Sequence, residues 1–213
     1  MRGILLFVAA LSAVWSGSSA AQTPSVTVNE FGVRIAGITP GGSAVVLTTS
    51  RGTFRGRLDV RSDARLIHDT DGDGVIQYTP ERPVELRSVW AAVDFTTGAY
   101  AIAAPPRFPL YVREWQEASF RKDAEGAIVG LGRSIPRLVF LLVRPGQGAW
   151  LLRAADGGAG DRDGAKNGDL TVAFEDLVAV EGKEKAPKNV KAGDAVIAID
   201  PGQLDVFATG VRK

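Results

Sequence analysis

Three aspartates at alternate positions are the clearest chemical signal in this chain. Asp69, Asp71 and Asp73 lie in the stretch HDTDGDGVIQYTP, residues 68–80, where glycines allow sharp bends. Carboxylates this close repel one another unless a cation lies between them. Calcium takes six to eight oxygen ligands at about 2.3–2.6 Å, so the spacing predicts a calcium site. The alternative is a solvated Asx-turn loop that joins two strands without a metal.

Residues beyond the aspartates extend the candidate ligand set. The carbonyl oxygen of Val75 is a candidate fourth ligand, and Gln77 is a candidate fifth, directly or through water. Residues 69–77 resemble the D-x-D-G-D-G calcium loops of EF-hands, dockerin modules and thrombospondin-type repeats. The resemblance ends there, because the twelfth position, a bidentate glutamate in EF-hands, is Pro80, with Glu81 one residue later. It implies a structural calcium ion that binds weakly unless Glu81 or a distant residue completes the shell.

A second acidic loop follows in the other half of the chain. The stretch DGGAGDRDGAKNGD, residues 156–169, has no apolar residue larger than alanine, and it offers five oxygen-bearing side chains: Asp156, Asp161, Asp163, Asn167 and Asp169. Arg162 and Lys166 can neutralise this loop internally, so we predict a long hydrophilic hairpin rather than a second cation site.

The motifs of common catalytic sites are absent from the sequence. The chain has one histidine, His68, and no cysteine, so it lacks the usual zinc ligands. It contains no G-x-S-x-G motif and no glycine-rich phosphate loop between a strand and a helix. We therefore expect a protein that is not an enzyme, and a hydrolase with a site near His68 is an alternative.

The tryptophans raise a second alternative, a carbohydrate-binding accessory protein. Trp90 and Trp150 stand inside predicted strands and are expected in the core. Trp115, between Glu114 and Gln116, is the candidate for an exposed platform that stacks on sugars.

The N-terminal residues are typical of an export signal. Arg2 precedes an apolar run of about a dozen residues, and Ser19 and Ala21 fit a cleavage site before Gln22. We expect a signal peptide over 1–21 and no transmembrane segment in the mature chain, hence a periplasmic or extracellular location. Loss of Arg2 leaves 24 basic against 24 acidic residues, which disfavours nucleic acid as a partner.

The remaining pattern is that of short strands. Apolar residues alternate with polar ones, and turn signals recur every eight to twelve residues. We predict an all-β fold of two antiparallel β-sandwich, immunoglobulin-like domains, over 22–105 and 106–213, divided near the proline-rich PPRFP of residues 105–109. One larger sandwich is the alternative. Residues 113–126 are a candidate helix or loop.

Two strand segments are the most distinct. RLVFLLV, residues 137–143, is continuously apolar, as in a strand covered on both faces, and AWLLRAA is its expected hairpin partner. From 51 to 66, apolar side chains fall on even and charged side chains on odd positions, which predicts one core face and one arginine-rich solvent face.

These patterns favour an exported, non-catalytic binding or structural protein of the cell envelope or extracellular space, stabilised by calcium. Its partner is expected to be a protein or a polysaccharide of unknown identity.

Overall fold

The computed structural model describes residues 23–55, 57–81, 84–106, 112–114, 120–122, 126–130, 135 and 137–210. The predicted signal peptide and Trp115 lie outside these residues and stay predictions. In the described part of the chain, no helix is long and apolar enough to cross a membrane.

The fold is all-β, as predicted, apart from one 3-10 turn at Phe174–Asp176. The strands, in chain order, are β1 (Ser25–Asn29), β2 (Gly32–Ala36), β3 (Ser43–Phe54), β4 (Arg57–His68), β5 (Val75–Tyr78), β6 (Ser88–Asp94), β7 (Tyr100–Ala103), β8 (Val112–Glu114), β9 (Phe120–Lys122), β10 (Gly126–Gly130), β11 (Leu138–Arg144), β12 (Gly148–Ala154), β13 (Asp169–Ala173), β14 (Val178–Ala179), β15 (Ala195–Asp200) and β16 (Asp205–Gly210).

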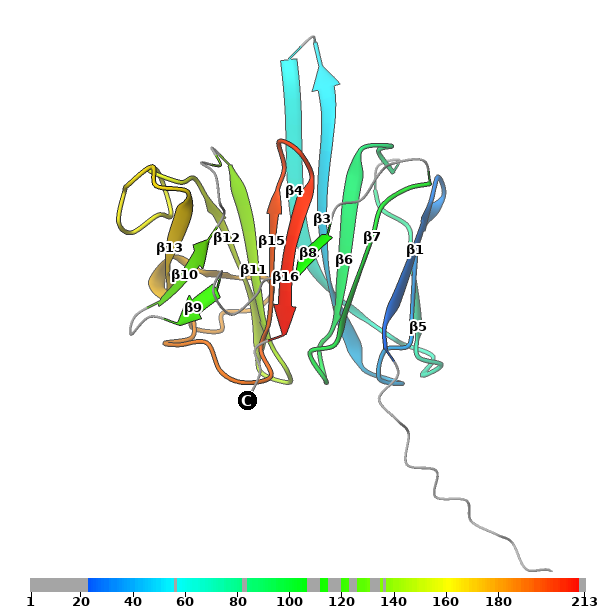
Figure 1. The fold of residues 1–213 in the computed structure, drawn as a ribbon. Coiled ribbons are helices and arrows are strands. Elements are labelled where there is room, and N and C mark those ends of the chain that lie inside the picture. The colour runs from blue at the N-terminus through cyan, green and yellow to red at the C-terminus, as the bar shows by residue number, and fades with distance from the viewer. Residues whose placement is uncertain are drawn as a thin grey trace, which may run out of the picture.

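These strands form four sheets. Strands up to Ala103 build a three-stranded sheet, β1-β2-β5, and a four-stranded sheet, β4-β3-β6-β7. Strands from Val112 onward build a six-stranded sheet, β14-β12-β11-β15-β16-β8, and a three-stranded sheet, β13-β10-β9. All neighbours pair antiparallel except β16 and β8. In Figure 1 the two three-stranded sheets lie outermost and the two larger sheets lie between them.

Three apolar cores separate the four layers, because the larger sheets bury side chains on both faces. Along β11, Leu138, Phe140 and Leu142 belong to the outer core beside β13, whereas Val139, Leu141 and Val143 belong to a central core shared with the four-stranded sheet. β3 alternates in the same way, with Val45 and Leu47 in the central core. This alternation explains why β6, β11 and β15 are buried along their whole length.

The two halves of the chain also meet through main-chain contacts. The Gly146 N–H, in the turn after β11, donates a hydrogen bond to the Phe95 carbonyl at 2.7 Å. Beside it, a Cβ built at Gly98 would lie 2.7 Å from the Gly193 carbonyl oxygen, and the φ of Gly98 is 76°. Both the contact and the backbone conformation therefore require glycine there. The division into domains 22–105 and 106–213 stays a prediction.

The register of β3 and β4 corrects one expectation from the sequence. Phe54 pairs with Arg57, so the chain reverses between these two residues, and Arg55 adopts a φ of 51°. The alternation predicted for 51–66 therefore holds only along β4, where Ala64 and Leu66 pack against the central core. Arg51 pairs with Val60, so it shares the apolar face of β4, and its guanidinium donates to the Gly202 carbonyl.

Four other expectations have definite outcomes. Trp90 and Trp150 are buried, and β11 pairs with β12 in the predicted hairpin. The candidate helix at 113–126 is wrong where the structure describes it, since 112–114 and 120–122 are strands. The loop 156–169 is not a hairpin, because β12 and β13 belong to different sheets.

The central core predicts that both halves unfold together. Leu141 and its neighbour Leu142 are both fully buried, the first in the central core and the second in an outer core. Replacing either with alanine should cost about 2–5 kcal/mol of unfolding free energy. Calorimetry of Leu141→Ala should still show one transition, shifted to lower temperature. Two separated transitions, with only one shifted, would contradict a shared core.

Candidate metal site

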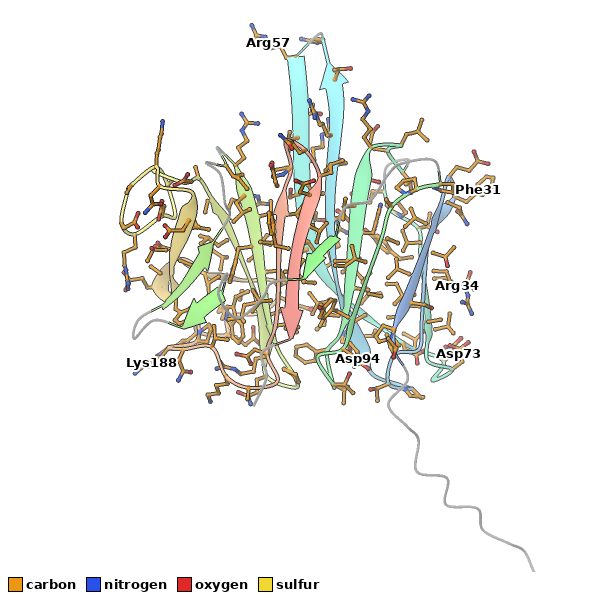
Figure 2. All side chains as sticks on the ribbon, in the orientation of Figure 1. Phe31, Arg34, Arg57, Asp73, Asp94 and Lys188 are labelled. Carbon is orange, nitrogen blue, oxygen red and sulfur yellow. The ribbon has the colours of Figure 1, made fainter. Side chains whose placement is uncertain are left out.

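The three aspartates predicted to bind calcium converge in the structure. Asp69, Asp71 and Asp73 lie between the end of β4 and the start of β5, and each offers a carboxylate oxygen within 4.8 Å of the other two. Asp69 is buried, and the other two side chains are exposed. The two sheets built from residues 25–103 are called the first sandwich here, and the two built from residues 112–210 the second. Figure 2 shows Asp73 at one end of the first sandwich and Arg57, in the β3–β4 hairpin, at the opposite end. A cation between the three carboxylates would thus be open to solvent on one side.

Asp69 holds the loop in shape through hydrogen bonds to its main chain. Its carboxylate accepts hydrogen bonds from the N–H groups of Gly41 at 2.8 Å, Gly72 at 3.1 Å and Gly74 at 2.9 Å. Its own N–H donates to the Gly42 carbonyl at 2.9 Å. A carboxylate offers about four acceptor positions, so three accepted bonds leave room for one coordination bond to a cation. Asp69 would therefore be a monodentate ligand.

The glycines shape the turn so that this geometry can form. Gly74 has a φ of 76°, and a Cβ built there would lie 3.0 Å from the Ile38 carbonyl oxygen. The Gly74 carbonyl in turn accepts a hydrogen bond from the Ile38 N–H at 3.3 Å. The loop 69–74 therefore lies against the segment between β2 and β3, which contains both Ile38 and Gly41.

Asp71 and Asp73 supply the exposed side of the cluster. Asp73 Oδ1 accepts a hydrogen bond from the Val75 N–H at 2.7 Å, an Asx turn that fixes the side chain at the start of β5. A hydrogen bond with the Asp69 side chain, with the nearby charge of Asp73, raises the pKa of Asp71. The pKa of Asp69 is lowered, and the hydrogen bond from the Gly41 N–H is the main cause. In the absence of a cation, Asp69 thus carries the charge and Asp71 holds a proton more readily than usual.

The other predicted ligands lie on β5. Val75 pairs with Ala36 and Gln77 pairs with Arg34. The Gln77 side chain is exposed. As ligands, Val75 and Gln77 stay predictions. Glu81, considered for the missing twelfth position, is instead engaged by Arg65, with Nη1 3.2 Å from Glu81 Oε1.

The donor set fits a hard divalent cation. All three side chains are carboxylates, so the cluster offers oxygen ligands and neither nitrogen nor sulfur. Calcium and magnesium prefer oxygen ligands. Calcium tolerates irregular and partly aqueous shells, whereas magnesium requires nearly ideal octahedral geometry. An exposed cluster with few protein ligands therefore favours calcium with several bound waters.

The second acidic loop is organised differently. Asp156 and Asp161 are buried and accept main-chain N–H groups of the same segment, Asp161 from Gly157 at 2.8 Å and Thr171 at 3.0 Å. Burial raises the pKa of Asp161. Asp169 Oδ1 is buried with no hydrogen-bond partner. Among the described residues, no three carboxylates besides those of 69, 71 and 73 converge in the same way. The acidic side chains therefore hold this loop in shape through hydrogen bonds to its main chain, and the lack of a second cation site stays a prediction.

His68 contacts a serine across the hairpin. Its Nδ1 lies 2.7 Å from the Oγ of Ser43, the residue it pairs with on β3. The ring also lines a cavity of about 310 Å³ together with Glu181 and Glu184. A hydroxyl beside an imidazole is the start of a nucleophile–base arrangement, which also requires a group that orients the imidazole and donors for an oxyanion. The sequence did not point to Ser43, because the pairing depends on the β3–β4 register.

Comparisons with known proteins give little further information. No protein-family model matches the chain, and no curated protein matches it. A solved structure that aligns with it is red sea bream transglutaminase, at 12% sequence identity and a TM-score of 0.20, over 91% of this chain and 31% of that chain. The chain thus spans about a third of that neighbour, and a similarity this low supports no conclusion about function.

Removing one charge from the cluster should stabilise the calcium-free protein. Asp71→Asn keeps a hydrogen bond to Asp69 and removes the repulsion, so we expect a small rise in melting temperature without calcium. Asp69→Ala removes the acceptor of three N–H groups and should lower it by about 5–10 °C. Circular dichroism melts of calcium-free protein measure both. Equal effects of the two variants would show that the carboxylates do not interact as described.

The opposed pKa shifts predict a distinct pH dependence. The raised pKa of Asp71 means that its ionised form destabilises the calcium-free fold, and this effect disappears as the pH falls through the folded-state pKa of Asp71. The lowered pKa of Asp69 contributes stability above its unfolded value of about 3.9, and that contribution is lost as the pH falls through its folded-state pKa. The stability advantage of Asp71→Asn should therefore be present at pH 7 and vanish in acid. An advantage that is constant with pH would contradict the assignment.

Proposed function

We propose that this chain is an exported, non-catalytic binding or structural protein of the cell envelope or extracellular space, stabilised by calcium. The observation that supports it is the convergence of three carboxylate oxygens within 4.8 Å in the loop 69–73. The signal-like N-terminal sequence and the lack of cysteine agree with export of a protein that gains stability from something other than disulfides.

The position of the cluster suggests what the cation would do. Its loop joins β4 of the four-stranded sheet to β5 of the three-stranded sheet, and Asp69 also holds Gly41 in the segment joining β2 to β3. Both segments cross between the two layers of the first sandwich. A calcium ion here would fasten the two crossings to each other, which is a structural role.

A weak site would suit the proposed location. Extracellular calcium modules bind with dissociation constants of about 10⁻⁴–10⁻³ M, and a site with few protein ligands belongs in that range. The partner is proposed to be a protein or a polysaccharide, and the balanced charge makes nucleic acid an unfavourable partner. Of the alternatives, an accessory platform at Trp115 falls outside the described residues. A hydrolase at His68 has the Ser43 contact in its favour, and it would also need a third group that orients the imidazole.

Calcium should raise the melting temperature of chelated protein. At about 10 mM, 10–100 times the expected dissociation constant, calcium should stabilise the fold by about 1.4–2.7 kcal/mol, or about 3–10 °C for a chain of this size. Asp71→Ala should abolish the rise. Scanning calorimetry with and without calcium measures the effect.

Two controls separate binding from a general salt effect. Magnesium at the same concentration should have a smaller effect, because the site is irregular and exposed. Asp176→Ala removes an exposed aspartate from the other sandwich and should leave the calcium response unchanged. Melting curves that coincide in calcium and in chelator would overturn the proposal.

A further inference from the structure

A groove opens on the first sandwich where one layer is longer than the other. Strands β3 and β4 have twelve residues each, whereas β1, β2 and β5 have four or five. The short sheet therefore covers only part of the face of the long sheet, and Figure 1 shows the β3–β4 hairpin extending beyond the other strands. The uncovered part contains a cavity of about 310 Å³. This is near the lower end of the range for small-molecule sites and matches one or two sugar rings.

Two aromatic rings form one side of the groove. Tyr78 ends β5, and its ring centroid lies 6.3 Å from that of Trp90 on β6, with the planes tilted by 60°. Trp90 is 5% exposed, and its indole N–H donates to Ser88 Oγ at 3.0 Å. Ser88 Oγ in turn donates to the Glu85 carbonyl at 2.7 Å. These hydrogen bonds hold the buried indole in place. Tyr78 is half-buried, so its ring is the more accessible of the two from the groove.

The floor of the groove is polar and carries paired charges. Thr48 and Ser50 on β3 provide hydroxyls, and Arg61, Asp63 and Arg65 follow on β4. Arg65 contacts both Asp63, Nε to Oδ2 at 2.7 Å, and Glu81 at 3.2 Å, and Arg61 contacts Asp59. The arginines are therefore already neutralised, and with Glu85 the lining carries more carboxylates than cations. An anionic ligand would have to displace these carboxylates from the arginines.

The main chain of β3, in the floor of the groove, is not available for recognition. β3 lies between β4 and β6 and pairs with both, so its N–H and carbonyl groups are used within the sheet. A peptide that adds a strand needs a free sheet edge, and the floor of this groove is a sheet face. A ligand on this face would therefore be recognised by hydroxyls, paired charges and an aromatic ring. The hydroxyls and charged groups form hydrogen bonds, and the ring packs against C–H groups.

We infer that this groove binds a neutral saccharide of one or two rings, with Tyr78 against the sugar face and Thr48, Ser50, Asp63 and Arg65 bonding its hydroxyls. Hydroxyl groups can add to the existing ion pairs without breaking them, because each carboxylate and guanidinium has further bonding positions.

The test is a titration of the full chain with a panel of neutral sugars: maltose, cellobiose, lactose and N,N′-diacetylchitobiose. Indole N–H resonances are followed by NMR, and that of Trp90 is identified with Trp90→Phe. At least one sugar should shift the Trp90 resonance with a dissociation constant below ~10 mM. Tyr78→Ala should weaken binding about tenfold or more, and Tyr78→Phe should keep it. Ser50→Phe should block the groove while preserving a residue suited to a strand.

Arg57→Ala, at the exposed hairpin tip, is the matched control and should bind as the unchanged chain does. Galacturonate and a lysine-containing tripeptide test the charge argument, and tighter binding of either than of every neutral sugar overturns the inference. So does the absence of any Trp90 shift at ~50 mM of each sugar, or binding that survives both Tyr78→Ala and Ser50→Phe. Titrations with and without calcium show whether the sugar also binds in the absence of the ion, so a failure of the metal proposal can be told from a failure of this one.

Discussion

The face-to-face packing of the two larger sheets is the constraint on which the rest of this structure depends. Both sheets bury most of both faces, so the middle positions of their inner strands are apolar, and β6, β11 and β15 are buried throughout. Chemistry is thereby excluded from the middle of the molecule. Polar side chains with a role in binding can lie only at sheet ends, at crossings between layers, or where a covering layer is too short, and the cation cluster and the groove occupy two such places.

Loops in both halves of the chain are held by buried carboxylates instead of disulfides. Asp69 accepts three main-chain N–H groups where the chain crosses from the four-stranded sheet to β5. In the loop between β14 and β15, Asp194 accepts hydrogen bonds from Nε of Arg144 at 3.0 Å and from the Lys191 N–H at 2.7 Å, with Arg144 and Asp194 both buried. Each carboxylate satisfies main-chain donors that a loop would otherwise leave buried without partners. In a chain without cysteine, buried aspartates at loops thus supply order that small exported proteins often gain from covalent bridges.

The sequence predicted the all-β class and the convergence of Asp69, Asp71 and Asp73 because both depend on local patterns. Alternation of apolar residues determines strands, and aspartates two apart around glycines share one turn. The central core was not predictable in this way, since a strand covered on both faces shows the same apolar run whichever sheet covers it. The arginine face of 51–66 was misassigned because Phe54 pairs with Arg57, so even positions of β3 share a face with odd positions of β4. The positions of Ser43, Gly41 and Tyr78 beside these sites depend on how the strands pair with one another. No local sequence pattern specifies that pairing.

The cation loop and the groove lie at opposite ends of one short strand. β5 begins two residues after Asp73 and ends at Tyr78, and within the described part of the chain it pairs with β2 alone. An edge strand of four residues has few contacts of its own, so its position depends on how its ends are held. At one end Asp73 accepts the Val75 N–H, and at the other Tyr78 packs against Trp90. Whatever fixes the loop 69–73 therefore also fixes the ring that faces the groove, and a structural cation here would influence binding without contacting the ligand.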